Sequence, residues 1–163
     1  MHRSAGHALL KHLTLDYEFL MQVSADLDDP QILSGTPLGT RRILYGRRGA
    51  FSGPSLQGEL LPGGGDWVLL RQDGVAELDI RFTLRTDDEH LIYMQCSGIF
   101  DISPQVSQRI RAGDNVDSSE YYFRTSPRFE TGSKKYSRLN RLIAVGIGRR
   151  TASGMVTDIF AIR

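Results

Sequence analysis

Strict alternation of apolar and polar side chains between residues 75 and 85 constrains the fold of this chain more than any other feature. The two interleaved sets are Ala76, Leu78, Ile80, Phe82 and Leu84, and Glu77, Asp79, Arg81, Thr83 and Arg85. Successive side chains of a β-strand point to opposite faces, so the pattern predicts a strand with one apolar face. On a sandwich the polar face would be solvated, whereas on a small closed barrel it could line the lumen. Periodicity favours the solvated arrangement but leaves both open.

Similar stretches recur at near-regular spacing along the chain. We expect strands over residues 13–25, 42–45, 67–70, 75–85, 91–100, 121–129, 139–147 and 155–163. Only one internal helix is convincing: Ser103 can cap it, Pro104 suits its first position and Gly113 can end it. Many short strands without a βαβ rhythm favour a closed barrel or a sandwich.

Residues 51–67 are rich in glycine and contain Pro54, Pro62 and the only tryptophan, Trp67. Glycine supplies backbone angles closed to other residues, and proline removes a donor from a strand ladder. We therefore expect bends, bulges and turns here that fix the direction of Asp66 and Trp67. Asp66 could either cap backbone amides of the turn or lie at the rim of a pocket.

The length of 163 residues is that of one domain with a single core. No apolar run approaches the roughly 18 residues of a membrane-spanning helix. The N-terminus lacks the pattern of a signal peptide. We expect a flexible segment over residues 1–12, a barrel domain over 13–163 and a cytoplasmic location. The single cysteine, Cys96, lies in an apolar strand pattern and is interpreted as a core residue.

A net charge of +1 argues against general nucleic-acid binding. Arginine pairs at 41–42, 47–48 and 149–150 could recognise an anion, although solvated turns and strand edges are the favoured interpretation. The four histidines show no metal-ligand spacing, and the glycine-rich stretches lack the context of a phosphate or dinucleotide site. We therefore expect no metal, no cofactor and no membrane partner, while a homodimer is compatible with exposed barrel edges.

Several blocks together resemble a known family. They are Gly35-Thr-Pro-Leu-Gly39, Phe51-x-Gly-Pro-x-Leu-x-Gly58, Leu61-Pro-Gly-Gly-x-Asp-Trp67, Leu78-Asp-x-Arg81, Tyr122-Phe-Arg-Thr-x-Pro127, Phe129-Glu-Thr131, Leu139-Asn-Arg141 and Val145-Gly-x-Gly148. In this order they resemble the uncharacterised family called domain of unknown function 3237, or the UPF 0311 family, over roughly residues 13–163. The resemblance implies a small calycin-like barrel with no generally established activity. The chain departs from the family pattern at Glu89, where glycine is usual.

The predicted fold is accordingly all-β: a single antiparallel β-barrel of about eight strands, calycin-like, with one short peripheral helix. The resemblance also suggests that polar residues of its blocks gather around a ligand. Asp79 or Glu130 is the candidate general base, because a partly desolvated carboxylate has a raised pKa. The candidate substrate-binding residues are Asp66, Trp67, Arg81, Tyr93, Tyr122, Arg124 and Asn140. Arginines would hold an anion, aromatic rings would stack on a flat molecule and Asn140 would donate a hydrogen bond.

Two functions are compatible with these residues. One is a cofactor-independent isomerase, cyclase or lyase that moves a proton on a small aromatic, polyketide-like or anionic metabolite in the lumen. The other is a non-catalytic ligand-binding or carrier barrel whose charged residues are internal braces. We favour the enzyme narrowly, and a purely structural module without a cavity is the third alternative.

Overall fold

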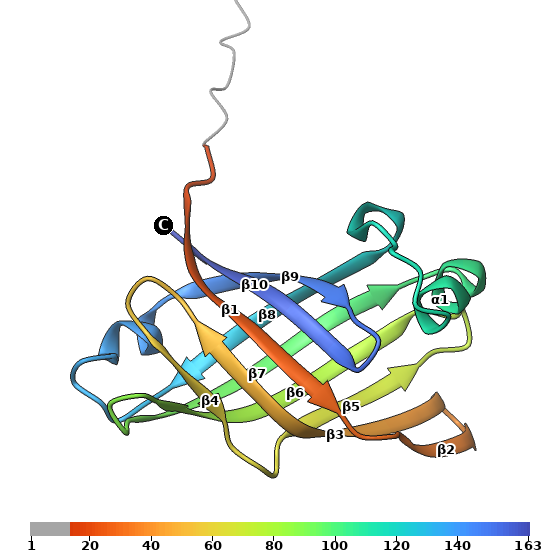
Figure 1. The fold of residues 1–163 in the computed structure, drawn as a ribbon, viewed down its shortest axis with the longest axis horizontal. Helices are drawn as coiled ribbons and strands as arrows, with labels where there is room; N and C mark the ends of the chain where they lie inside the picture. The colour runs from red at the N-terminus through yellow and green to blue at the C-terminus, as the bar shows by residue number, and fades with distance from the viewer. Residues whose placement is uncertain (1–13) are drawn as a thin grey trace, which may run out of the picture.

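The computed structural model describes residues 14–163, which form ten strands, one α-helix and two short 3-10 helices (Figure 1). The expected flexible segment over residues 1–12 lies outside the described residues. The elements are β1 (Tyr17–Leu27), β2 (Gln31–Thr36), β3 (Gly39–Ser52), β4 (Gln57–Leu60), β5 (Gly65–Leu70), β6 (Ala76–Thr86), β7 (Leu91–Asp101), α1 (Pro104–Arg111), η1 (Ser118–Glu120), β8 (Tyr122–Glu130), η2 (Ser137–Arg141), β9 (Ile143–Arg150) and β10 (Gly154–Ile162).

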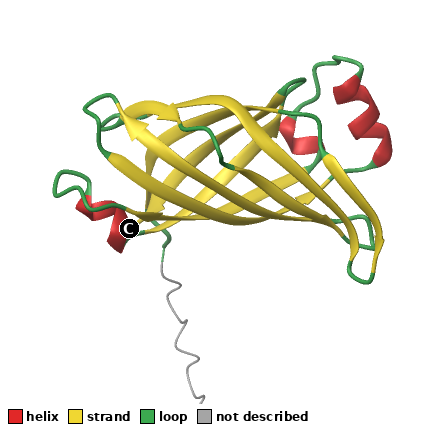
Figure 2. Cartoon of the chain, turned by 90° about the horizontal axis from the view of Figure 1, so that it is seen from below, coloured by secondary structure: helices red, strands yellow, loops and turns green. Residues whose placement is uncertain are grey.

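The strands close into an antiparallel barrel. Neighbouring strands follow the order β1, β10, β9, β8, β7 and β6, then β4 and β5 share one position beside β6 and β3, and β3 returns to β1. The ring therefore has eight positions, and β2 extends from it as a hairpin with β3 (Figures 1 and 2). This closure confirms the predicted fold and decides between a barrel and a sandwich.

The apolar face of β6 forms part of the core. Leu78, Ile80 and Leu84 are buried, whereas Glu77 and Arg81 on the alternate positions are exposed to solvent. The polar face of residues 75–85 therefore points to solvent and not into the lumen. This is the solvated arrangement that periodicity favoured, although it occurs on a barrel.

The two ends of the barrel differ. The end that we call the mouth contains α1 and the turns that join β5 to β6 and β9 to β10; the far end contains the β3–β4 and β6–β7 turns and η2 (Figure 2). Segments crossing the far end contribute buried Leu56, Tyr136 and Leu139 to the core. The far end is consequently closed by side chains.

Helix α1 covers part of the mouth. Its N-cap is Ser103, whose hydroxyl accepts a hydrogen bond from the Val106 N–H at 3.2 Å, and Gly113 follows it with φ = 87°. Val106 and Ile110 pack against the core. The helix is thus where the capping residues predict it. No helix within residues 14–163 has the length and apolar character needed to cross a bilayer.

The glycine-rich segment 51–67 is more regular than expected, because it contains β4 and the start of β5. Its glycines still have specific uses. Gly63 has φ = 97°, and a Cβ on Gly64 would lie 2.2 Å from the Phe82 ring. Glu89, where the resemblance led us to expect glycine, adopts φ = 65°. Non-glycine residues rarely adopt this left-handed conformation, so Glu89 is a strained turn position.

Candidate ligand site at the barrel mouth

A cavity of about 420 Å³ lies at the mouth of the barrel. Its volume is within the range of pockets that hold small molecules. Most of its wall is apolar and comes from strands β1, β2, β3, β5, β6, β7, β8 and β10 and from α1. The apolar lining includes Leu44, Val68, Leu70, Ala76, Leu78, Phe100, Ile102, Ile110, Phe123 and Met155.

One carboxyl group, that of Asp66, lies in this apolar surround. Along β5 the inward side chains are those of Asp66, Val68 and Leu70, all of which line the cavity, so strand alternation gives Asp66 its direction. Asp66 is only 4% exposed. Its Oδ1 accepts a hydrogen bond from the Asp79 backbone N–H at 3.1 Å, and among the described residues no partner bonds its Oδ2.

Burial raises the pKa of Asp66 from 3.8 to about 7. The hydrogen bond from the Asp79 backbone opposes this rise, the negative charge of Asp79 adds to it, and the positive charge of Arg150 also lowers the pKa. Desolvation dominates because the carboxylate form has one protein donor in place of a hydration shell. Both protonation states of Asp66 are therefore populated near neutral pH.

Three arginines also line the cavity: Arg42 from β3, Arg111 from α1 and Arg150 from β9. Each lacks a carboxylate within 4 Å in the described part of the chain, although residues 14–163 contain twelve arginine–carboxylate pairs elsewhere. The Nε of Arg42 is buried without a hydrogen-bond partner. Burial lowers the pKa of Arg150 from its usual value. A guanidinium nevertheless stays protonated in proteins, so the cavity carries excess positive charge.

Alternation divides two of the sequence's arginine pairs between the two faces of the barrel wall. Arg42 and Arg150 face the cavity, whereas their neighbours face outward. Arg41 Nη1 donates to the Trp67 carbonyl at 2.7 Å, and Arg149 Nη2 lies 3.2 Å from Asp158 Oδ2. The favoured interpretation of these pairs as solvated charge therefore holds for only one member of each.

Cys96 belongs to the core, as expected. It is 4% exposed, and burial raises the pKa of its thiol to about 12. It lines a separate internal cavity of about 20 Å³, together with Thr125 and Met155. Because the thiolate is strongly disfavoured there, Cys96 has no role as a nucleophile at the mouth.

The predicted catalytic residues lie outside this cavity. Asp79 and Arg81 form a two-pronged ion pair on the outer wall, with both N–O distances 3.0 Å and side chains 43% and 47% exposed. Glu130 is exposed on the last residue of β8, next to the far end. The structure does not bring these two carboxylates together or place either in the lumen, because both fall on the outward positions of their strands.

The other predicted binding residues, apart from Asp66, also lie on the outer surface. Trp67 packs edge-on against Tyr45 at 6.0 Å, and the Arg124 guanidinium lies 5.1 Å from the centre of the Tyr122 ring. Tyr93 is exposed on β7. The Asn140 side chain accepts from the Thr131 N–H at 2.8 Å and donates to the Thr131 carbonyl at 2.9 Å, which ties together the segment before β9.

Sequence reasoning therefore named Asp66 as a site candidate, weighed Arg42 and Arg150 only as members of arginine pairs that could recognise an anion, and did not single out Arg111. A usable signal was present for Asp66: it shares strand parity with Val68 and Leu70, which would place it on their apolar face. For the arginines only the pairing of strands distant in sequence reveals a common cavity. Arg42 opposes Val68 and Leu44 opposes Asp66, so Arg42 and Asp66 are diagonal neighbours on the inner face.

The fold and the cavity define a class of protein: a small closed antiparallel barrel with a charged pocket at one end. Residues 15–162 match the family described as "Protein of unknown function (DUF3237)", and the chain belongs to that family. The resemblance drawn from the sequence blocks is thereby confirmed. A UPF0311 protein of Rhodopseudomonas palustris is 31% identical over 90% of this chain and 95% of its own length. One from Clostridium acetobutylicum is 32% identical over 91% and 94%.

Solved structures resemble the barrel closely. A conserved protein of unknown function from Rhodopseudomonas palustris has a TM-score of 0.87 at 30% identity, covering 93% of this chain and 100% of its own. A β-barrel-like protein from Acinetobacter baumannii has a TM-score of 0.81 at 35% identity, covering 94% and 99%. A structure described as an enzyme from Penicillium herquei has a TM-score of 0.71 at 17% identity, covering 94% and 98%. At that identity the likeness concerns the fold alone.

Proposed function

We propose that this protein binds a small organic molecule in the mouth cavity and that Asp66 exchanges a proton with it without a cofactor. The observation that carries the proposal is the position of Asp66: a carboxyl group 4% exposed, with one oxygen held by a backbone N–H and the other without a partner, on the wall of a cavity of about 420 Å³. This replaces Asp79 and Glu130 as the proposed base. Reactions of this kind include isomerisation, cyclisation and elimination.

The chemistry of the site is compatible with both directions of proton transfer. With a pKa of about 7, Asp66 is partly ionised at neutral pH and can act as a base or as an acid. As a base, Asp66 forms an O–H bond while a C–H bond beside a carbonyl group breaks, and the electron pair moves onto the carbonyl oxygen as an enolate. Arg42 and Arg150 would stabilise that negative charge. The return of the proton to another position completes an isomerisation.

The hydrogen bond to Oδ1 also orients the carboxyl group of Asp66. Because the Asp79 backbone holds Oδ1, the other oxygen faces the cavity in a defined direction. A general base must lie within hydrogen-bond reach of the proton that it removes. The apolar wall supplies the rest of the binding and excludes water from the carboxyl group, which is the cause of the raised pKa.

Proton exchange can be measured without knowledge of the natural substrate. We would incubate the protein in deuterated water with 4-phenylbutan-2-one and, separately, with 2-oxo-4-phenylbutanoate, and follow deuterium incorporation beside each carbonyl by NMR. The wild-type protein is expected to accelerate exchange of at least one probe. Asp66→Asn should reduce the accelerated rate about 100-fold or more, because general base catalysis contributes at least that factor.

Asp79→Asn is the matched control. It removes the side-chain charge but keeps the backbone N–H that binds Asp66, so exchange should persist. An unchanged rate in Asp66→Asn would overturn the assignment of the base. Binding of a probe to the wild-type protein without any exchange would instead support the carrier alternative, for which the apolar lining of the cavity is the favourable observation.

A further inference from the structure

We infer that the natural ligand is an amphipathic carboxylate, with its charged group between Arg42 and Arg150 and its apolar body against the side chains from β6, β7 and β8. This inference rests on the proposed function, since it concerns the same cavity, and it adds the chemical class of the ligand. Its basis is that the arginines around the cavity have no carboxylate partner among residues 14–163.

The first step is the charge balance. Arg42, Arg111 and Arg150 contribute three positive charges to the cavity wall, and Asp66 contributes at most one negative charge. None of the arginines has a carboxylate within 4 Å in the described residues, whereas most other arginines of the barrel do. Arg111 is exposed to solvent, whereas Arg42 and Arg150 are partly buried, and desolvated charges without a partner are unfavourable in a folded protein. A bound anion would remove that penalty, so the cavity selects for negative charge.

The second step is the donor geometry. The Arg42 Nε is buried and donates to no group. Within residues 14–163 Arg150 bonds another side chain only through its backbone N–H, which donates to the Tyr121 hydroxyl at 3.1 Å, and its guanidinium has no hydrogen-bond partner among these residues. Two guanidinium groups that offer free N–H donors match the two oxygens of a planar carboxylate. Arg111 differs, because its Nη2 donates to the Ser107 hydroxyl at 3.3 Å. Arg42 and Arg150 are therefore the arginines that the inference assigns to the ligand.

The third step excludes a phosphate group. Phosphate sites in proteins usually offer several backbone N–H groups at a helix N-terminus or in a glycine-rich loop. Here the lining residues of α1 are Ser107, Ile110 and Arg111, which lie in its middle and last turn, so the free backbone N–H groups of the helix N-terminus do not line the cavity. The cavity wall is otherwise mainly aliphatic and aromatic. A carboxylate with an apolar body matches it better than a phosphate does.

The fourth step is the orientation of the ligand. Phe123 on β8 lies opposite Arg42 on β3 across the ring, and Phe100 on β7 and Leu78 on β6 continue the wall from β8 towards β5. Phe100 and Phe123 pack together with ring centres 5.1 Å apart and ring planes inclined at 49°, and they form an apolar surface. An apolar body would lie on this surface while the carboxylate faces the arginines, with Asp66 beside the polar end.

The test compares three probes that share one apolar body: 4-phenylbutanoate, 4-phenylbutanamide and 4-phenylbutylamine. Binding would be measured by isothermal titration calorimetry to the wild-type protein and to three variants, Arg42→Gln, Arg150→Gln and Arg149→Gln. Wild type should bind the carboxylate about tenfold or more tightly than the amide and the amine least, since a charge-assisted hydrogen bond contributes about one decade of affinity. Arg42→Gln and Arg150→Gln should remove most of that preference.

Arg149→Gln is the matched control, because Arg149 precedes Arg150 on β9 but faces outward, and it should keep the full preference. Thermal unfolding verifies that each variant is folded. Equal or tighter binding of the amide or amine, a preference unchanged in both cavity variants, or binding of none of the probes would each overturn the inference. The proposed function would survive if 4-phenylbutan-2-one still exchanged its protons in an Asp66-dependent manner, so the two failures are distinguishable.

Discussion

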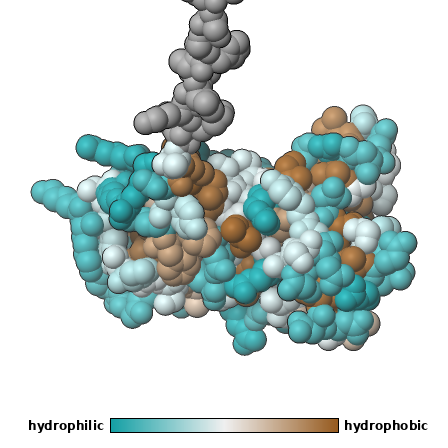
Figure 3. All heavy atoms as spheres, turned by 90° about the horizontal axis from the view of Figure 1, so that it is seen from above, coloured by the Kyte–Doolittle hydropathy of each residue, from teal (hydrophilic) through white to brown (hydrophobic). Residues whose placement is uncertain are grey.

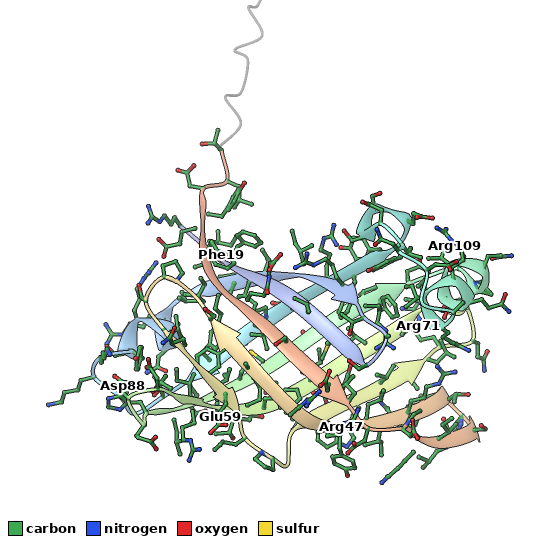
Figure 4. All side chains as sticks on the ribbon, in the orientation of Figure 1. Phe19, Arg47, Glu59, Arg71, Asp88 and Arg109 are labelled. Carbon is green, nitrogen blue, oxygen red and sulfur yellow. The ribbon has the colours of Figure 1, made fainter. Side chains whose placement is uncertain are left out.

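The mouth and the far end of the barrel each contain an aspartate with a displaced pKa, and the displacements have opposite signs. At the mouth, burial raises the pKa of Asp66 to about 7. At the far end, hydrogen bonds from Lys135, Thr86 and Tyr136 lower the pKa of Asp88, with donor distances of 2.5, 2.6 and 2.9 Å. Figure 4 shows Asp88 at the end opposite Arg109 of α1.

The difference lies in the number of donors and not in the residue type. Asp88 has three side-chain donors and braces the β6–β7 turn against the segment before η2. Asp66 has one backbone donor and an unpartnered oxygen on a cavity wall. A carboxylate whose lone pairs are satisfied by the protein stabilises the fold, whereas one left under-satisfied costs stability and is available to a ligand. The comparison therefore separates a structural aspartate from the one that we propose to be functional.

The largest expected effect concerns packing at the two ends. Leu84, near the far end, is fully buried, so Leu84→Ala should lower the free energy of unfolding by about 2–5 kcal/mol. Val68 lines the mouth cavity and is only partly buried, so Val68→Ala should cost less than about 1.5 kcal/mol. Urea unfolding measures both. Equal losses would show that the mouth is packed as tightly as the far end, against the comparison.

The next effect is a gain of stability in Asp66→Asn. The folded pKa of Asp66 is raised, so its contribution to stability is greatest below pH 3.8 and is lost as pH rises towards 7. Asparagine resembles the protonated acid and has no such loss. Above pH 7 the variant should therefore be more stable than wild type by roughly 2–4 kcal/mol, with little difference near pH 4. Denaturant unfolding between pH 4 and 8 tests this; a constant difference would contradict the raised pKa.

Asp88→Asn should lower the stability of the fold, in contrast to Asp66→Asn, and the change should be smaller. The lowered pKa of Asp88 means that its carboxylate stabilises the fold above pH 3.8, and that this contribution is lost as pH falls through the lower folded pKa. At pH 7 the thermal midpoint should fall by a few degrees. The fall should shrink in strongly acidic solution. Thermal unfolding followed by circular dichroism would reveal it, and a rise in the midpoint at pH 7 would reverse our assignment of Asp88 as a brace.

The smallest effect is expected on the outer wall. Asp79→Asn disrupts an exposed ion pair with Arg81, which contributes little, so the thermal midpoint should change by no more than about 2 °C. The negative charge of Asp79 also raises the pKa of Asp66, so the substitution should lower that pKa. NMR titration of the Asp66 carboxyl carbon measures the shift. A rise would show that the two groups interact by another route.

The sequence predicted the class of fold well because its signals are local. Alternation gave the two faces of β6, and Ser103, Pro104 and Gly113 gave the helix. Local signals fail where both faces of a strand are apolar. On β9 the larger residues Ile143 and Val145 point outward and are exposed. Figure 3 shows hydrophobic groups among polar ones on the outer surface of the molecule.

The inner face of β9 instead carries small residues such as Gly148, because a Cβ there would lie 2.5 Å from the Phe123 ring. Size complementarity across the barrel, and not hydrophobicity, decides which face of this strand points inward. A single strand read alone does not contain that information.

The candidate site depended still more on distant pairings. Asp79 and Glu130 were chosen because they occur in family blocks, yet nothing in those blocks states on which side of the wall a side chain lies. Arg42, Asp66 and Arg150 line the same cavity only because β3 pairs with β5 and because the ring closes between β1 and β3. The desolvation that raises the pKa of Asp66 is produced by residues from many strands, and no local pattern expresses it.

The pairing of β1 with β10 also has a practical consequence for engineering. Tyr17 is opposite Ile162, and the Arg163 N–H donates to the Asp16 carbonyl at 2.9 Å. Asp16 and Arg163 are therefore neighbours, and β1 begins where β10 ends, at the far end (Figure 1). A short glycine-rich linker from Arg163 to Asp16 would allow a circular permutant. Its new N- and C-termini would lie in the β6–β7 turn. The cavity at the mouth would keep every wall residue in place, because the reconnection and the cut both occur at the opposite end.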